Sequence, residues 1–167
     1  SSYSFSAERE DYDMDDDGLI EINDLADLDE IRNNLDGSTL YGSNTGCPEV
    51  GCDGFELTTD LDFDTNADGL MDEQDAYWND GLGWEPIRKT PEGNSFSAVL
   101  EGNNHTIKGL YIQRADDYAV GLFSAMHQAE IRNINIDTQF SIRGKMETGT
   151  LVGSSFDTRF ENISSHS

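Results

Sequence analysis

The sequence is poor in positive charge. Only 10 of its 167 residues are lysine or arginine, against 34 aspartates and glutamates, so the formal net charge is −24 at pH 7. Nucleic acids and anionic membrane surfaces repel such a chain and are not expected partners. Cations are expected partners, because a bound divalent metal relieves the repulsion that destabilises a compact acidic chain. A salt-adapted, soluble surface is the alternative explanation for the scattered acids.

Long hydrophobic runs are also absent. No apolar stretch approaches the roughly 20 residues that cross a bilayer, so we expect no membrane insertion of this segment. The opening residues, SSYSFSAERE, lack the basic and apolar regions of a signal peptide. Because the chain begins without Met and ends in ENISSHS, a pattern typical of the middle of a repeating unit, we expect a fragment of a longer chain, with any signals and anchors elsewhere.

Cysteine is scarce, and its two copies lie in one short loop with the sequence GCPEVGC. Such a loop can fold back and bring Cys47 and Cys52 into bonding range. We expect a disulfide between them, which would imply a periplasmic or extracellular location outside the reducing cytosol, and we expect a secreted or cell-surface protein. A two-cysteine metal site is the alternative, although no other cysteine or clustered histidine completes a zinc shell.

Catalytic motifs are missing as well. The histidines are scattered, and there is no metalloprotease spacing, Gly-x-Ser-x-Gly elbow or phosphate-binding glycine loop. We therefore expect no enzyme activity. The alternative is a polysaccharide-acting β-helix enzyme or its carbohydrate-binding part. Such an enzyme requires a cleft where Arg132, Arg143 or Lys145 converges with acids.

Two acidic segments, Asp13–Asp24 and Asp64–Asp75, follow the twelve-residue EF-hand-type pattern. That pattern needs oxygen ligands at positions one, three and five, glycine at six, a main-chain oxygen at seven and acids near nine and twelve. The predicted metal ligands of the first loop are Asp13, Asp15, Asp17, the carbonyl of Leu19, Glu21 and Asp24. Those of the second loop are Asp64, Asn66, Asp68, the carbonyl of Leu70, Asp72 and Asp75.

The ligand chemistry of both loops favours calcium. Carboxylate and carbonyl oxygens without nearby histidine or cysteine argue against zinc and copper, and the high ligand number argues against magnesium. Aspartate at position twelve makes both loops similar to dockerin and thrombospondin type 3 loops rather than to a calcium sensor. We therefore expect two structural calcium ions.

The hydrophobic pattern predicts a short helix followed by β-strands. Apolar residues at helical spacing from Leu25 to Leu35 indicate an amphipathic helix, which Asn23 or Asp24 can cap and Gly37 can end. From about Phe96, short apolar runs alternate with Gly, Asn and Asp. We expect residues 1–95 to form a calcium-loop and helix cap region, and residues 96–167 to form β-solenoid repeats of the same continuous unit.

The strand region repeats at an offset of 29 residues, which superimposes Leu122 on Leu151 and Asn133 on Asn162. A second offset, of 24 residues, places Ile107 on Ile131 in the same way. Turns of a solenoid stack such residues, with Asn or Gly at the corners. The predicted fold is mainly β, a right-handed parallel β-helix with an N-terminal calcium loop and a short α-helix. A β-sandwich of meandering hairpins is the alternative.

Several segments of the sequence resemble GLUG-repeat bacterial surface proteins. They are DDDGLIEI at 15–22, FELTTDLDFD at 55–64, GWEPI at 83–87, EGNNHTI at 101–107 and VGLF at 120–123. The resemblance implies a calcium loop and helix leading into a parallel β-helix, in a large exported, adhesin-like protein without agreed catalytic residues. The expected function is therefore a calcium-stabilised segment for adhesion or ligand binding, whose partner is a glycan or another surface protein.

Overall fold

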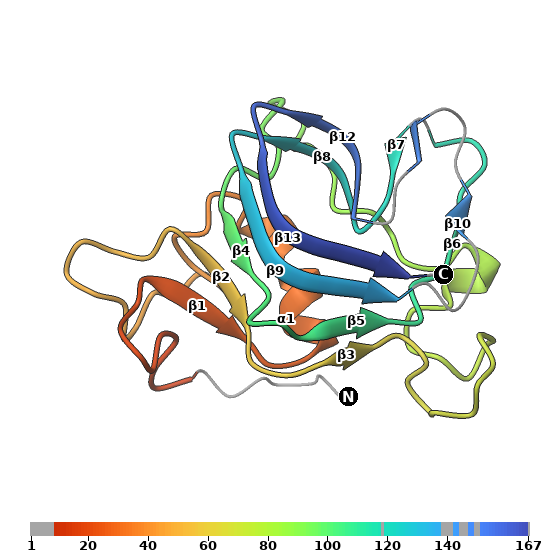
Figure 1. Ribbon diagram of the computed structural model, residues 1–167, viewed down its shortest axis with the longest axis horizontal. Coiled ribbons are helices and arrows are strands. Elements are labelled where there is room, and N and C mark those ends of the chain that lie inside the picture. Colours follow the sequence, from red (N-terminus) through yellow and green to blue (C-terminus); the bar gives the residue numbers. More distant parts are fainter. Residues whose placement is uncertain (1–8, 118, 138–141, 144–146, 149–150, 167) are drawn as a thin grey trace.

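The computed structural model describes residues 9–117, 119–137, 142–143, 147–148 and 151–166. Within these ranges the protein is mainly β, with little helix, and its paired strands run parallel (Figure 1). The prediction of a mainly β protein is confirmed. Meandering hairpins would pair antiparallel instead, so the described strands do not form the alternative sandwich.

Most strands belong to one large sheet. Its strands are β1 (Leu19–Ile22), β2 (Gly54–Leu57), β4 (Val99–Glu101), β9 (Glu130–Asp137), β5 (Thr106–Lys108) and β3 (Leu61–Asp62), in that order, and β13 (Arg159–His166) also pairs with β9. Three smaller pairs are β6 (Ile112–Gln113) with β10 (Ile142–Arg143), β7 (Ala119–Val120) with β11 (Glu147–Thr148), and β8 (Phe123–His127) with β12 (Val152–Phe156). Strands from both sides of residue 95 therefore share one sheet.

The 29-residue repeat is confirmed by the strand register. Ile131 pairs with Phe160, and Asn133 and Asn162, 29 positions apart, lie at equivalent places in β9 and β13. The 24-residue offset is wrong, because Ile107 pairs with Ile136 instead of Ile131. Apolar residues recur at every second position of a strand, so a sequence can be aligned in several registers, and the corner loops between the strands decide which one forms.

The hydrophobic core lies on the inner side of the stacked strands. Ile20, Phe55, Leu100 and Ile131 occupy one register level on four successive strands, and all four are fully buried. Such rows of stacked apolar residues hold parallel strands together through dispersion and loss of water contact.

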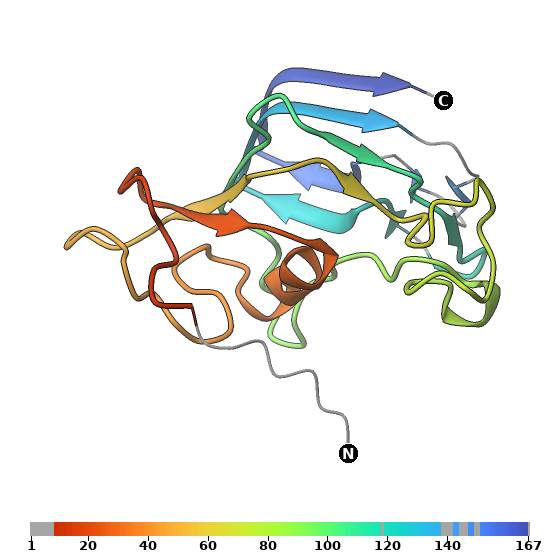
Figure 2. The same ribbon diagram turned by 90° about the horizontal axis from the view of Figure 1, so that it is seen from below.

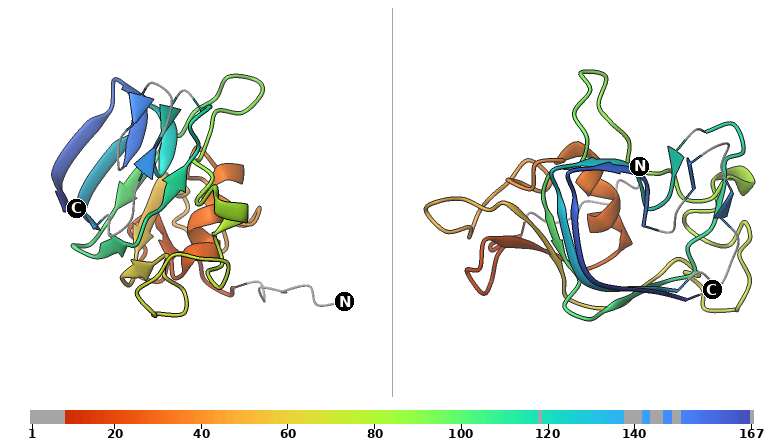
Figure 3. Two further views of the ribbon diagram at one scale, coloured as in Figure 1. Left: turned by 90° about the vertical axis from the view of Figure 1, so that its right-hand side faces the viewer. Right: turned by 45° about the horizontal axis from the view of Figure 1, so that its top comes forward.

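The helix covers one end of this core. It runs as α1 (Leu25–Glu30) and continues as the 3₁₀ turn η1 (Ile31–Asn33), so the regular helix ends earlier than the apolar spacing predicts. Leu28 and Ile31 are fully buried in the same core as the strands. Figure 2 shows α1 beside β1 at one end of the stack, and the right panel of Figure 3 shows it within the outline of the bent strands.

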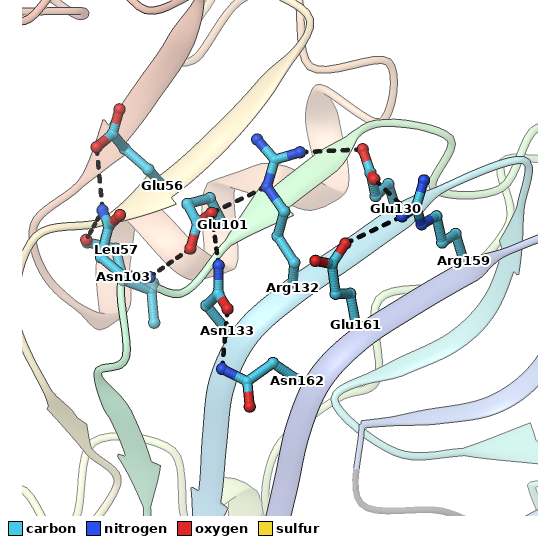
Figure 4. Close-up of polar contacts among 10 residues, drawn as sticks. All are labelled: Glu56, Leu57, Glu101, Asn103, Glu130, Arg132, Asn133, Arg159, Glu161 and Asn162. Carbon is cyan, nitrogen blue, oxygen red and sulfur yellow. Dashed lines mark hydrogen bonds and ion pairs between the residues drawn. The ribbon is translucent and has the colours of Figure 1, made fainter.

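Strands β9 and β13 both bend sharply at an asparagine. Asn133 and Asn162 have φ angles of +56° and +52°, in the left-handed region that asparagine tolerates better than most residues. The Asn162 amide donates a hydrogen bond to Asn133 Oδ1 at 2.9 Å, and the Asn133 amide donates to Glu101 Oε1 at 3.1 Å (Figure 4). The prediction of corner or ladder asparagines is confirmed.

Substitution of the corner asparagine tests this arrangement. We expect Asn133→Ala to lower the free energy of unfolding by about 3 kcal/mol, because two side-chain hydrogen bonds are lost and alanine is strained at positive φ. Asn133→Gly removes the same bonds without that strain, so its loss is expected to be about 1–2 kcal/mol. Urea unfolding followed by circular dichroism measures both. Equal stability of the two variants would show that the backbone conformation contributes nothing.

Candidate metal centre

The first acidic loop folds around the carboxylate of Asp13, which is fully buried. Its Oδ2 accepts the N–H of Gly18 at 2.7 Å, and its Oδ1 accepts the N–H of Asp17 at 3.2 Å. Asp16 and Gly18, at loop positions four and six, have φ angles of +57° and +82°. Two residues of this turn therefore adopt the left-handed conformation, and glycine at position six does so without steric cost.

The second loop repeats this conformation. Asp64 Oδ2 accepts the N–H of Gly69 at 2.8 Å, and Oδ1 accepts the N–H of Asp68 at 3.3 Å. Ala67 and Gly69 have φ angles of +56° and +78°. The backbone turns at positions four and six are thus the same in both loops.

The fifth positions match as well. Asp17 Oδ1 accepts the N–H of Leu19, and Asp68 Oδ1 accepts the N–H of Leu70, each at 2.9 Å. Leu19 is the first residue of β1, whereas Leu70 is exposed. Two segments far apart in the chain therefore share one hydrogen-bonding scheme, in which the aspartates at positions one and five fix the backbone of the turn.

Four carboxylates converge at the first loop. Asp13, Asp15, Glu21 and Glu56 each place one oxygen within 4.8 Å of the others, and all but Asp15 are buried. Glu56 belongs to β2 and faces Glu21 of β1 in the register of the two strands. Sequence analysis missed Glu56, whose only signal is a single acid within the otherwise apolar strand GFEL.

Burial of these carboxylates shifts their pKa values. Burial raises the pKa of Asp13 to about 6, and burial together with the neighbouring Asp17 carboxylate raises that of Glu56 to about 8. Burial also raises the pKa of Glu21. Burial acts in the same direction on Asp17, but the neighbouring Glu56 carboxyl and the hydrogen bond from the Leu19 N–H outweigh it, so the pKa of Asp17 is lowered. A divalent cation would replace this repulsion with attraction.

The two loops close differently. In the first, both carboxylate oxygens of Glu21, at position nine, accept the N–H of Met14 at 3.1 and 2.9 Å. In the second, Asp75, at position twelve, accepts the N–H groups of Thr65 and Asp72 at 2.8 and 2.9 Å. The acid that holds the start of the loop is therefore the ninth residue in one case and the twelfth in the other.

The structure places Asp24 outside the first cluster. Its Oδ1 accepts the N–H of Asp27 at 2.8 Å, so Asp24 is the N-cap of α1. The physical reason is the extended strand β1, which advances about 3.3 Å per residue and carries Asp24 about 10 Å past Glu21. The turn after Met71 instead brings Asp75 back toward its loop, through the hydrogen bond from Asp75 N–H to the carbonyl of Asp72 at 3.0 Å.

The remaining predicted ligands of the second loop point to local partners. The Asn66 amide donates to Asp68 Oδ2 at 3.2 Å, and Asp72 Oδ1 accepts the N–H of Gln74 at 2.9 Å. In the part of the chain that the structure describes, no group of three or more acids converges here as it does at the first loop. Asp64 and Asp75, the acids that hold this loop, are both buried.

Beside the first loop lies the cysteine pair. Cys47 and Cys52 form a disulfide, with their Cα atoms 5.6 Å apart, which confirms the prediction and leaves no cysteine for a zinc site. The bridge closes the loop that packs against the first acidic loop, where the N–H of Tyr12 donates to the carbonyl of Thr45 at 2.7 Å.

The basic residues named for an enzyme cleft were Arg132, Arg143 and Lys145. Arg132 lies on the outer face of the sheet, where it forms ion pairs with Glu101 and Glu130 at 2.9 and 3.1 Å (Figure 4). The side chain of Arg143 and the whole of Lys145 lie outside the described residues. Arg132 thus neutralises a surface row of acids.

Aromatic residues pack together beside the second loop. Trp84 is only 1% exposed, and its ring packs against those of Phe63 and Tyr77 at centroid distances of 5.2 and 5.3 Å. Trp78 stacks on Tyr111 at 5.4 Å. Trp84 therefore belongs to the core, and Tyr77 packs against it.

None of the helices in the described part of the chain has the length and hydrophobicity of a membrane span.

No family model matches the chain, and no solved structure matches it significantly. The chain is 31% identical over 140 residues to halomucin of Haloquadratum walsbyi, covering 83% of this chain but 1% of halomucin. It is 27% identical over 146 residues to a protein of Evansella cellulosilytica provisionally named a Gly-rich membrane protein, covering 86% of this chain and 14% of that protein. This chain therefore spans only a small part of each relative.

Proposed function

We propose that this chain is a calcium-stabilised, non-catalytic segment of a secreted or cell-surface protein, used for adhesion or ligand binding. The observation that carries the calcium assignment is the shared geometry of the two loops. In both loops the carboxylate at position one accepts hydrogen bonds from the N–H groups of positions five and six, and the residues at positions four and six have positive φ angles. Chance acidic turns have no reason to share this scheme, whereas calcium loops of the EF-hand type are built on it.

The first loop also passes a test of chemical fit. Asp13, Asp15, Glu21 and Glu56 offer carboxylate oxygens only, the donor set that a hard cation such as calcium prefers. Gathering buried carboxylates is unfavourable without a cation. Calcium would also stabilise the folded chain in a second way, because each bound ion reduces the repulsion among the acids of a chain whose net charge is −24.

The surface assignment and the architecture are supported by separate observations. The relatives carry the names halomucin and Gly-rich membrane protein, and the disulfide fits a location outside the cytosol. The stacked parallel strands, the asparagine corners and the 29-residue register support a right-handed parallel β-helix of the GLUG-repeat kind. Such an extended stack offers a regular outer face for a glycan or a protein partner.

Isothermal titration calorimetry with calcium tests the proposed function. We expect two calcium ions per chain, one for each loop, and one ion for either Asp13→Asn or Asp64→Asn, since each change removes a charge from position one. The matched control is Asp116→Asn, which removes one exposed charge outside the loops and should leave both sites intact. A chain that binds no calcium, or loses neither site in the loop variants, would contradict the proposal.

A further inference from the structure

One buried carboxylate oxygen in the first cluster lacks a partner. Glu56 is 6% exposed, and its Oε2 has no hydrogen-bond partner among the described residues. Leaving such an atom unsatisfied is unfavourable by about 1–3 kcal/mol, and by more for a charged group. Because an oxygen of Glu56 also lies within 4.8 Å of oxygens of Asp13, Asp15 and Glu21, this side chain belongs to that cluster.

The neighbours of Glu56 explain why this carboxylate differs from the next one along the sheet. Glu56 pairs with Glu101 of β4, and Glu101 pairs with Arg132 of β9. Arg132 neutralises Glu101 at 2.9 Å, whereas no lysine or arginine forms an ion pair with Glu56 among the described residues. Figure 4 shows this row crossing the strands, with Glu56 at the end away from the arginines.

An asparagine holds the other oxygen of Glu56. Asn103, at a corner with φ of +51°, donates its amide to Glu56 Oε1 at 3.0 Å and to the carbonyl of Leu57 at 2.9 Å. This bond fixes the carboxylate with one oxygen satisfied and the other free. A carboxylate oriented by an outer hydrogen bond is the usual arrangement of a metal ligand.

We propose that Glu56 is a ligand of the first calcium site, supplied by the sheet in place of the twelfth loop residue, and that Asn103 is its positioning residue. This inference rests on the proposed function, since it names a further ligand of the same site. It follows that a cation at this loop binds residues of both the loop and β2. The ion then ties the N-terminal loop to the strand stack and fixes the register of β1 on β2.

The test uses the Asp64→Asn background, in which only the first site remains, with calcium alone as the probe. We expect Glu56→Gln to weaken calcium binding at this site by at least roughly tenfold, since even outer-shell partners of metal ligands change affinity by that factor. In chelator, Glu56→Gln should melt at a higher temperature than its parent, because a neutral amide is buried without the cost of protonating a carboxylate or holding it beside other acids. Calcium should raise the melting temperature of the variant by less than it raises that of the parent. A merely structural carboxylate would not combine a higher melting temperature in chelator with a smaller increase on calcium binding.

Glu130→Gln is the matched control, since it removes a carboxylate of the same sheet that forms ion pairs with Arg132 and Arg159 and lies outside the four-residue cluster, and its calcium affinity should equal that of the parent. If Glu56→Gln does not fold, Glu56→Asp keeps the charge, shortens the side chain and should also bind calcium more weakly. If two calcium ions bind to the wild-type chain and the folded Glu56 variant has unchanged calcium affinity, the inference is wrong but the proposed function stands. If the wild-type chain binds no calcium, the proposed function itself fails.

Discussion

Removal of calcium is expected to lower the melting temperature of this protein by about 10–20 °C. At a calcium concentration of one hundred times Kd, each site stabilises the native state by about 2.7 kcal/mol through mass action, so two sites contribute roughly 5 kcal/mol. In a chain of this length, 1 kcal/mol corresponds to about 2–4 °C. Differential scanning calorimetry in calcium and in EDTA measures the difference.

Two controls separate specific binding from general screening in that experiment. Magnesium prefers to keep its waters and a strict octahedral geometry, so it should restore only a small part of the lost melting temperature. High sodium chloride screens the repulsion of exposed acids and should raise the melting temperature without reproducing the dependence on calcium concentration. A melting temperature that stays constant across a calcium titration would contradict the calcium assignment at both loops.

Trp84→Ala is expected to lower the free energy of unfolding by about 3–5 kcal/mol, the usual range for truncation of a buried tryptophan. Trp84 lies between the second loop region and the strand stack. Its ring contacts Phe63 and Tyr77, and its indole N–H donates to the carbonyl of Leu122 at 2.9 Å. Guanidinium unfolding followed by circular dichroism measures the loss.

Trp78→Ala is the matched control, because Trp78 is partly exposed and stacks on one ring, that of Tyr111. We expect a loss of about 1–2 kcal/mol there, from one aromatic pair and partial burial. Trp84→Phe keeps the ring contacts but removes the indole hydrogen bond, so its loss should lie between the two. If Trp84→Ala were no less stable than Trp78→Ala, the assignment of Trp84 to the core would be wrong.

Local sequence patterns predicted the parts of this protein whose ligands or neighbours lie close together in the chain. Asp13 and Asp64 hold equivalent turns because the spacing of positions one, five and six is itself the geometry of the loop. The disulfide formed because a short Gly/Pro loop brings Cys47 and Cys52 together whatever surrounds it. Asp24 caps α1 for the same local reason, and the extended strand β1 before it keeps it away from the cluster.

The sequence could not predict which strands lie side by side. The 24-residue offset fits the apolar pattern of Ile107 and Ile131, yet Ile107 pairs with Ile136, because corner loops of different length set the register of each turn. Nor could it show that the regular helix ends at Glu30, since tertiary packing decides where the last turn tightens. Pattern alone thus predicted that strands and a helix exist, and left their register and ends open.

The sequence by itself determined an acidic, mainly β chain with two oxygen-lined loops, one disulfide and a 29-residue strand repeat, because each of these depends on residue spacing within a short segment. Only the tertiary structure decided that β1 lies on β2 and therefore that Glu56 faces Glu21. A parallel pairing joins residues that are distant in the chain, so no local pattern records it. The same pairing leaves a buried carboxylate without a counter-charge, and this carboxylate, Glu56, is the ligand that we propose to add to the predicted site.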